Sequence, residues 1–201
     1  MLAYLLWHRP ADGVERKAYE HACERFHRSL HHSPPAGFRD SAVFRTGEIP
    51  WLAGGGYEDW YLLEDFTALG VLNEAAVAHG HRSAHDGVAR RFGAGAGGLY
   101  GLLEGYPDLG ASPLAVWVAR PLGAARQTLG ELLGDGMNPR HASLWRRGLV
   151  LGPAPEYCLL TRELPAGLAP TRLPKGWSAT VYEREMILRP YLSSAATRSD
   201  P

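Results

Sequence analysis

Two stretches of the chain open in the same way, and this echo is the strongest constraint on the fold. Residues 2–10 read LAYLLWHRP and residues 114–121 read LAVWVARP. Each is a short apolar and aromatic run closed by Arg-Pro, which predicts a buried strand that ends in a loop. A shorter echo, WYLL at 60–63 against YCLL at 157–160, follows at the corresponding place in each half. The sequence therefore predicts two related halves in tandem.

The first half alternates between strand and helix patterns. Residues 14–32 repeat apolar side chains at three- and four-residue steps, which predicts a helix that Pro34 ends. A second helix is predicted from Thr67, its expected N-cap, with an interruption at Gly80 and a new cap at Ser83. Strands are predicted at 2–7, 38–45, 57–66 and 99–103. The order β-α-β-β-α-β is that of the ferredoxin-like unit.

The second half has the same order in a degenerate form. A shorter helix is expected at 124–133, and the segment 165–174 holds three prolines that leave room only for a turn. Strands are predicted at 114–121, 143–146, 157–160 and 177–187. The domain boundaries are therefore an N-terminal ferredoxin-like half at 2–106, a degenerate C-terminal half at 114–188 and a disordered tail at 189–201.

A ferredoxin-like sheet has helices on one face and leaves the other face bare. Two such sheets in one chain can bury their bare faces against each other, which explains strands that are apolar at alternating positions on both faces. The predicted fold class is α+β, with antiparallel sheets packed face to face as an α+β barrel. Because the second half lacks its last helix, we expect the gap to be covered by residues 165–176 or by a second subunit in a homodimer.

This order of elements, with aromatic strands in both halves, resembles the dimeric α+β barrel superfamily in its single-chain, tandem form. The resemblance covers residues 2–187 and is architectural, since no family-defining catalytic motif is present. The superfamily includes antibiotic-biosynthesis monooxygenase-like, EthD-like and muconolactone isomerase-like proteins, and haem-using chlorite dismutase-like and dye-decolourising peroxidase-like groups. The resemblance implies a pocket between sheet and helices or inside the barrel, and it leaves the reaction open.

Composition narrows the classes of partner. Lys and Arg together number 21, as do Asp and Glu, so the formal net charge is zero. A protein that tracks phosphates needs a basic excess, so no nucleic-acid partner is expected. The apolar runs are too short to cross a bilayer, and residue 1 leads directly into a strand pattern without a basic leader, which favours a cytoplasmic location. Cys23 and Cys158 lie outside any metal-spaced motif and are interpreted as buried hydrophobic residues.

Large rings concentrate on the predicted strands and suggest a cavity for a flat organic ligand. Tyr4, Trp60, Trp117 and Trp145 are the candidate substrate-binding residues. Aromatic side chains can line an apolar pocket in which a few polar groups orient the ligand. The plain alternative is that these rings only fill a core.

Acid and base groups flank the same strands. His8 lies at the end of the first strand, and Glu58 and Asp59 open the third, so these three are the candidate catalytic residues. Alternation puts Tyr4 and His8 on one face of their strand, and Glu58 with Trp60 on one face of theirs. The sequence alone does not fix the register, so it leaves open whether the two faces coincide.

Histidines occur in pairs at helical spacing. His27 and His31 are four residues apart, as are His81 and His85, and His79 is close to the second pair. Two imidazoles on one helical face could bind a metal, with His81 and His85 as candidate ligands, but no third ligand is fixed. Haem is a separate option, implied by the resemblance, with His79, His81 or His85 as axial ligand. Neither cofactor is part of the leading hypothesis.

Three functions remain open at this point. The leading one is a cofactor-free enzyme or binder of a flat small organic molecule, monooxygenase-like or isomerase-like. The second is a non-catalytic structural or interaction protein. The third is a metal- or haem-binding protein that uses the histidines at 79–85. The glycine-rich segments 54–56 and 93–98 lack the strand–loop–helix context of a phosphate loop and are interpreted as turns and flexible loops.

Overall fold

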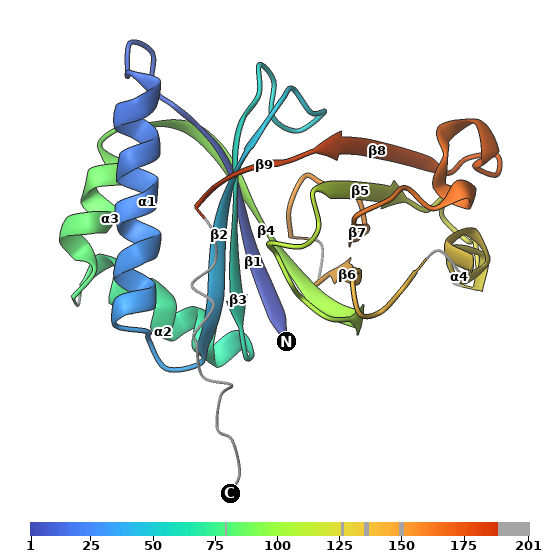
Figure 1. Cartoon of the computed structure of the whole chain (residues 1–201), viewed down its shortest axis with the longest axis horizontal. Coiled ribbons are helices and arrows are strands. Elements are labelled where there is room, and N and C mark those ends of the chain that lie inside the picture. The colour runs from blue at the N-terminus through green and yellow to red at the C-terminus, as the bar shows by residue number, and fades with distance from the viewer. Residues whose placement is uncertain (79, 126, 135–136, 149–150, 189–201) are drawn as a thin grey trace, which may run out of the picture.

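A computed structural model describes residues 1–78, 80–125, 127–134, 137–148 and 151–188 (Figure 1). Nine strands form one antiparallel sheet with helices on its outer side. The strands are β1 (Leu2–Pro10), β2 (Phe38–Thr46), β3 (Gly56–Leu63), β4 (Phe92–Gly105), β5 (Leu114–Ala119), β6 (Ser143–Arg147), β7 (Tyr157–Thr161), β8 (Ser178–Glu183) and β9 (Glu185–Leu188). The helices are α1 (Arg16–His32), α2 (Phe66–Val77), α3 (Arg82–Ala89) and α4 (Gln127–Leu133), with 3-10 turns η2 (Ala166–Leu168) and η3 (Pro170–Arg172).

The strand order is β8-β5-β7-β6-β4-β1-β3-β2-β9. Within it, β4-β1-β3-β2 and β8-β5-β7-β6 have the same ferredoxin-like arrangement, and β4 joins the two by pairing with β6. The two ends of the order, β8 and β9, are consecutive in the chain and separated only by Arg184. The sheet therefore curls until this one segment spans both edges, as the arch of β8 and β9 in Figure 1 shows. The predicted α+β barrel fold is confirmed, but the two sheets expected to pack face to face are joined through β4 and β6 into one curled sheet.

The inner face of the curled sheet is a dry core shared by both halves. Trp7 and Trp60 from the first half meet Trp117 and Trp145 from the second, and all four are fully buried. The outer face of the first half packs against α1, α2 and α3, and that of the second half packs against α4 and the turns. Strands β1, β3, β5 and β7 are thus buried on both faces, which explains why they read as nearly continuous apolar runs.

The segment 165–176 covers the outer face of the second half. Leu168 from η2 is fully buried there beside Leu129 and Leu133 of α4, and Trp177 closes the cluster. This is one of the two covers expected from the sequence. The homodimer, which was the other, stays a prediction.

The glycine-rich segment 93–98 was interpreted as a loop, and that interpretation is wrong. These residues belong to β4 and pair with β1 from Leu5 to Arg9. A Cβ at Gly95 would lie 2.6 Å from the carbonyl oxygen of Trp7, and one at Gly98 would lie 3.0 Å from the ring of Tyr100. Glycine here permits the close approach of backbone and rings within the sheet. Residue propensity alone would predict a turn for such a glycine-rich segment. Gly54 and Gly55 lie in the turn before β3, as predicted, whereas Gly56 is the first residue of that strand, and all three glycines have positive φ.

Other element boundaries also differ from the expectation. Helix α2 begins one residue after Asp65, whose side chain caps the amide of Ala68, so Thr67 is not the N-cap. The N-cap of α3 is His81 rather than Ser83. The last strand is broken at Arg184 because β8 and β9 pair with different neighbours. The predicted tail at 189–201 lies outside the described residues.

Within the described residues, no helix is both long and apolar enough to cross a membrane.

Candidate functional site

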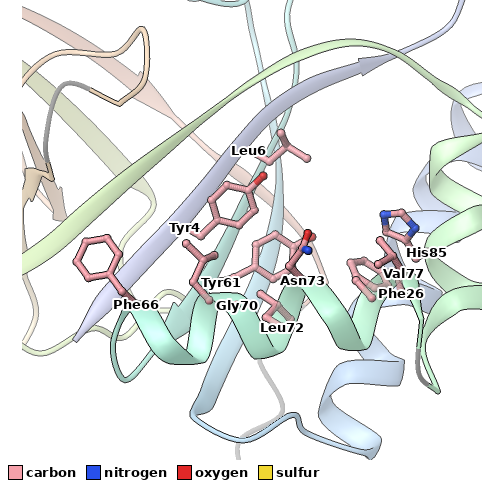
Figure 2. A pocket seen from close by; sticks show the side chains of 12 residues that line it. Tyr4, Leu6, Phe26, Tyr61, Phe66, Gly70, Leu72, Asn73, Val77 and His85 are labelled. Carbon is pink, nitrogen blue, oxygen red and sulfur yellow. The ribbon is translucent and has the colours of Figure 1, made fainter.

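A cavity of roughly 620 Å³ lies between the outer face of the first half-sheet and its helices (Figure 2). Strand β1 contributes Tyr4 and Leu6, and β3 contributes Tyr61. Helix α2 forms the opposite wall, with α1 and α3 at one end. The remaining lining residues are Phe26, Phe66, Leu69, Gly70, Leu72, Asn73, Ala76, Val77 and His85. The lining is mostly apolar and aromatic, with few polar groups, which is the composition of a small-molecule site.

A second pocket of roughly 240 Å³ adjoins this cavity on the side of α3. The two pockets share Leu6, Phe26, Tyr61 and His85. The inner pocket adds Asp59, together with Cys23, Val88, Ala89 and Phe92. The two pockets therefore adjoin, and Asp59 is the acidic group in the lining of the smaller one.

Asp59 lies between two buried histidines. Its Oδ1 is 3.0 Å from Nε2 of His8, and its Oδ2 is 3.3 Å from Nε2 of His27. The side chains of all three residues are at most 5% exposed. The contact of Oδ1 with His8 is close but off the line of a hydrogen bond, so Oδ1 keeps an unused lone pair. Oδ2 also accepts a hydrogen bond from the hydroxyl of Tyr61 at 3.1 Å.

The register of the sheet and one turn of helix α1 assemble this group. Leu6 on β1 pairs with Asp59 on β3, which puts the neighbouring His8 beside the carboxylate on the helix-facing side. Helix α1 buries the face that carries Tyr19 and His27 against the same side of the sheet. Tyr19 fixes the far nitrogen of His8, with its hydroxyl 2.6 Å from Nδ1. Sequence positions far apart thus meet because strand alternation and helical period both point them into the space between the sheet and α1.

Electrostatics keep Asp59 ionised. Burial by itself raises the pKa of a carboxyl, but the adjacent His8 and His27 outweigh it and hold the pKa of Asp59 below its usual range. Burial raises the pKa of the neighbouring Tyr61 hydroxyl well above its ordinary value, and Asp59 adds to that effect. Burial likewise raises the pKa of the Cys23 thiol. At neutral pH the smaller pocket therefore presents a carboxylate, a neutral phenol and a neutral thiol.

Tyr4 and Tyr61 form the flat floor of the larger cavity. Their rings stack at a centroid distance of 5.8 Å, and Tyr61 also stacks on His27 at 4.8 Å. Figure 2 shows the two rings and Leu6 facing helix α2 across the cavity, with Asn73 on that helix pointing toward them. A planar molecule can lie against such rings and present its edge to the polar groups.

The three predicted catalytic residues do not come together. His8 and Asp59 are in contact on the helix side of the sheet, but Glu58 points to the opposite side, into the core of the barrel. The sequence left open whether His8 and Glu58 lie on the same face of the sheet, and the register answers this. Trp7 pairs with Glu58, so both of these residues face the barrel core. The faces that carry His8 and Glu58 are different faces.

The predicted substrate-binding residues are also divided between the two faces. Tyr4 lines the cavity of Figure 2. Trp60, Trp117 and Trp145 lie in the barrel core, where their rings pack edge-on or tilted at centroid distances of 5.5 to 6.5 Å. Their indole N–H groups donate to protein partners, Glu58, Tyr182 and Ser143 in turn. The three tryptophans therefore fill a core, as the plain alternative anticipated.

The predicted metal ligands lie near the cavity without forming a metal site. His81 is buried, with Nδ1 3.0 Å from the hydroxyl of Ser29, whereas His85 lines both pockets and packs edge-on against Phe26. His79 lies outside the described residues. Among the residues that are described, no group of three His, Cys, Asp or Glu side chains is placed to hold a metal ion.

Haem does not fit the described lining of these pockets. A haem needs an axial ligand and cationic partners for its propionates. His85 could supply the first, but the described lining residues of the two pockets include no Arg or Lys for the second. No step of the chemistry below involves haem.

Sequence reasoning missed Tyr19, His27 and Tyr61 as members of the site. One signal was present in the sequence: His27 falls on the apolar stripe of α1, next to Phe26 and four residues after Cys23. A histidine on the buried face of a helix needs a polar partner, and Asp59 is the buried acid on the strand beneath it. Tyr61 carried no signal beyond its place in an aromatic strand.

Comparison with known proteins gives a fold and no family. No protein-family model and no curated protein sequence matches the chain. Among solved structures, a chlorite dismutase-like protein aligns over 92% of this chain and 94% of its own, with a TM-score of 0.55 at 12% identity. A monooxygenase-like protein from Lactobacillus acidophilus NCFM aligns over 91% and 93%, with a TM-score of 0.52 at 8% identity. An anthrone oxidase-like protein aligns over 92% and 93%, with a TM-score of 0.47 at 10% identity. The first two similarities support the fold alone, an α+β barrel with a curled antiparallel sheet.

Proposed function

We propose that this protein is a cofactor-free enzyme that binds a flat, weakly acidic organic molecule between β1, β3 and α2 and removes a proton from it. The observation that carries the proposal is Asp59: a buried, ionised carboxylate in the lining of the smaller apolar pocket beside the main cavity, with one oxygen that lacks an aligned donor. A buried polar atom without a partner is unusual, and a ligand hydroxyl or acidic C–H is a natural partner for it.

The walls suit an aromatic or conjugated ring system. Tyr4 and Tyr61 offer stacked rings on the sheet side, and Phe66 and Leu72 offer apolar contacts from helix α2. Asn73 can orient a carbonyl or hydroxyl group from the opposite wall. The cavity volume of roughly 620 Å³ falls within the range of about 300–1,000 Å³ that is common for sites of drug-sized ligands.

The chemistry starts with transfer of one proton. The O–H or C–H bond of the ligand breaks, its electron pair stays on the conjugated ligand, and a new O–H bond forms on Oδ1 of Asp59. Because His8 and His27 hold the pKa of Asp59 low, the carboxylate is ionised but weakly basic. It can therefore take protons only from groups far more acidic than a simple phenol, such as an enol between two carbonyl groups or a phenol in its excited state.

Two outcomes complete the reaction. Return of the proton to another ligand atom gives an isomerisation that needs no co-reactant. Addition of dioxygen to a carbon of the ligand anion, with return of the proton from Asp59, gives a hydroperoxide. Loss of water from it removes the outer oxygen and the hydrogen left on that carbon and leaves a carbonyl, so one oxygen atom enters the ligand and the ligand supplies the electrons. The monooxygenase-like structural neighbour with a TM-score of 0.52 shares only the fold, so oxygen uptake with conjugated phenols is the measurement that separates the two outcomes.

A photoacid tests the proton-transfer step directly. 2-Naphthol is flat, and its excited state releases the phenol proton to a nearby acceptor, which shifts its emission to that of naphtholate. We expect 2-naphthol to bind the wild-type protein and to show naphtholate emission there. Asp59→Asn should retain binding and lose most of that emission. Glu74→Gln, which removes an exposed carboxylate of α2 outside the lining of the cavity, is the matched control and should behave as wild type.

Two results would overturn the proposal. The first is failure of 2-naphthol and of a wider panel of flat phenols and enols to bind, which would favour a non-catalytic role. The second is equal naphtholate emission from the wild type and Asp59→Asn. Tryptophan quenching is an unsuitable probe, because Trp7, Trp60, Trp117 and Trp145 lie on the other side of the sheet from this cavity.

A further inference from the structure

His85 lies where the main cavity and the smaller pocket adjoin. Figure 2 shows its ring at the end of the main cavity where α3 lies. The residues that line both spaces are Leu6, Phe26, Tyr61 and His85. The first two are hydrocarbon side chains, and the Tyr61 hydroxyl already donates to Oδ2 of Asp59. A polar group of a ligand that occupies both spaces therefore has His85 as its available partner at the junction.

The ring of His85 has unused hydrogen-bonding capacity. Its Nδ1 is buried, and within the described residues this atom has no aligned hydrogen-bond partner. Oδ1 of the adjacent Asp86 lies 3.7 Å away, which is beyond hydrogen-bond distance. The other oxygen of Asp86 lies 3.8 Å from both Arg82 and Arg90, so this carboxylate has cations of its own. A buried polar atom normally has a partner, and a ligand can supply it here.

Contacts between α3 and α1 hold His85 in this place. At the start of α3, Nδ1 of His81 lies 3.0 Å from the hydroxyl of Ser29 on α1. His85 is one turn further along, so it lies on the same side of the helix. Its ring packs edge-on against Phe26 of α1 at a centroid distance of 5.5 Å. The four-residue spacing that suggested a metal pair thus gives one histidine that attaches α3 to α1 and one that lines the pockets.

Asp59 and His85 line the same small pocket, and their chemistry is complementary. Because the pKa of Asp59 is held low, its ligand must carry a proton that flanking carbonyl groups make acidic. When that proton leaves, the electron pair spreads onto the carbonyl oxygens, which share the negative charge. An N–H of the His85 imidazole can donate to one of these oxygens and stabilise the anion as it forms.

We infer that His85 binds a carbonyl oxygen of the ligand and that the substrate is a flat 1,3-dicarbonyl compound or its enol. This inference rests on the proposed function, because it names the substrate class and a second catalytic residue for the same site. Asp59 takes the proton from the central carbon of the diketone or from the oxygen of its enol. That C–H or O–H bond breaks, an O–H bond forms on Oδ1, and the electron pair moves toward the carbonyl oxygen that His85 holds. The hydrogen of His85 stays on its nitrogen, so the step needs no further proton acceptor.

Binding of 1,3-indandione to the full-length protein tests the inference. This compound is a flat 1,3-dicarbonyl, and its enolate absorbs at longer wavelength than its neutral form. Below the pH at which the free compound ionises, we expect the wild type to bind it and to increase the fraction present as enolate. His85→Phe keeps a ring against Phe26 but has no donor. It should bind indandione roughly 10- to 100-fold more weakly, as expected for one hydrogen bond to a charged group, and with a smaller enolate fraction.

Three controls separate a hydrogen bond from a change in packing. His85→Gln keeps an N–H donor and should recover most of the indandione affinity. His21→Phe makes the same substitution at an exposed position of α1 outside both linings and should behave as wild type. 2-Naphthol has no carbonyl group, so its affinity should be the same for the wild type and His85→Phe. Equal losses of affinity for both ligands in His85→Phe would overturn the inference, as would failure of the wild type to bind indandione.

The two proposals fail separately. If Asp59→Asn abolishes naphtholate emission but His85→Phe binds indandione as the wild type does, the role of His85 is wrong and the proposed function stands. If His85→Phe weakens indandione binding but Asp59→Asn leaves the enolate fraction unchanged, His85 holds the carbonyl oxygen and the proposed proton transfer to Asp59 is wrong.

Discussion

Two consecutive residues of β3, Glu58 and Asp59, place carboxylates on opposite faces of one sheet in very different states. Glu58 accepts four donors: the indole N–H groups of Trp7 and Trp60, the hydroxyl of Tyr182 and the guanidinium of Arg184. Asp59 keeps one oxygen without an aligned donor and borders a cavity. Both are buried acids, so burial alone does not identify a site. Asp59 is the functional candidate because one of its oxygens has no aligned hydrogen-bond donor and lies beside a pocket, whereas the oxygens of Glu58 are all hydrogen-bonded within the protein.

Glu58, whose carboxylate accepts all four of these donors, has a clear structural role. Arg184 occupies the break between β8 and β9, where one strand leaves the second half of the sheet and pairs with β2. Its guanidinium binds Glu58 from inside the barrel, donates to the carbonyl of Ser112 and packs 4.0 Å from the ring centre of Phe44. The ion pair thus connects the β8–β9 segment, which contains Arg184, to β3 in the first half.

The largest effect on stability is expected from removing the carboxylate of Glu58. Glu58→Ala leaves the Arg184 guanidinium buried without its counter-charge, and loss of one partner of a buried pair costs about 3–5 kcal/mol. We expect a decrease of that size in the free energy of unfolding, measured by urea titration. The double variant Glu58→Leu with Arg184→Leu removes both charges and should be less destabilised than the single variant. Equal losses in the two proteins would show that the charge pair is not the cause.

A smaller and pH-dependent effect is expected at Asp59. Its pKa is lower in the folded protein than in the unfolded chain, so the ionised carboxylate contributes stability above the unfolded pKa of about 3.9. That contribution is lost as the pH falls through the folded pKa. The wild type should therefore be more stable than Asp59→Asn at pH 7, and this advantage should shrink below about pH 4.

Urea titrations of the wild type and Asp59→Asn at pH 7, 5 and 3 measure this difference. Glu74→Gln serves as the control, because its carboxylate is exposed and its substitution should give no comparable change. A stability difference that stays constant from pH 7 to pH 3 would contradict the assignment of a depressed pKa to Asp59.

The sequence predicted the fold better than it predicted the site, for a physical reason. Hydrophobic periodicity is local, so the apolar runs and the helix of residues 14–32 could be read directly. The closing contact, in which Val43 of β2 pairs with Leu188 of β9, joins residues far apart in the chain and leaves no local pattern. The same holds for register, which alone separates Glu58 from Asp59 in space.

His8 and Asp59 could be found because each is a polar residue in or beside an apolar strand, where a lone charge is costly. Their shared partner His27 could have been found from its place on the apolar face of α1. The sequence did not separate the tryptophans of the barrel core from the rings of the cavity, because a core and a ligand pocket favour the same residue types. Only the three-dimensional structure shows that Trp117 contacts Trp7 and Tyr100 inside the barrel, while Tyr4 faces open space.

The smallest expected effect separates the two aromatic groups. Tyr4→Ala removes one ring of the cavity floor and its stacking, which is worth about 0.5–1.5 kcal/mol beyond buried area, so 2-naphthol should bind up to about tenfold more weakly. Trp117→Phe, in the barrel core, should lower the free energy of unfolding and leave 2-naphthol affinity unchanged. Fluorescence titration of the dye measures affinity, and urea titration measures stability. If Trp117→Phe weakened dye binding as much as Tyr4→Ala, the ligand would occupy the barrel interior, and the outer face of β1 and β3 would not be the site.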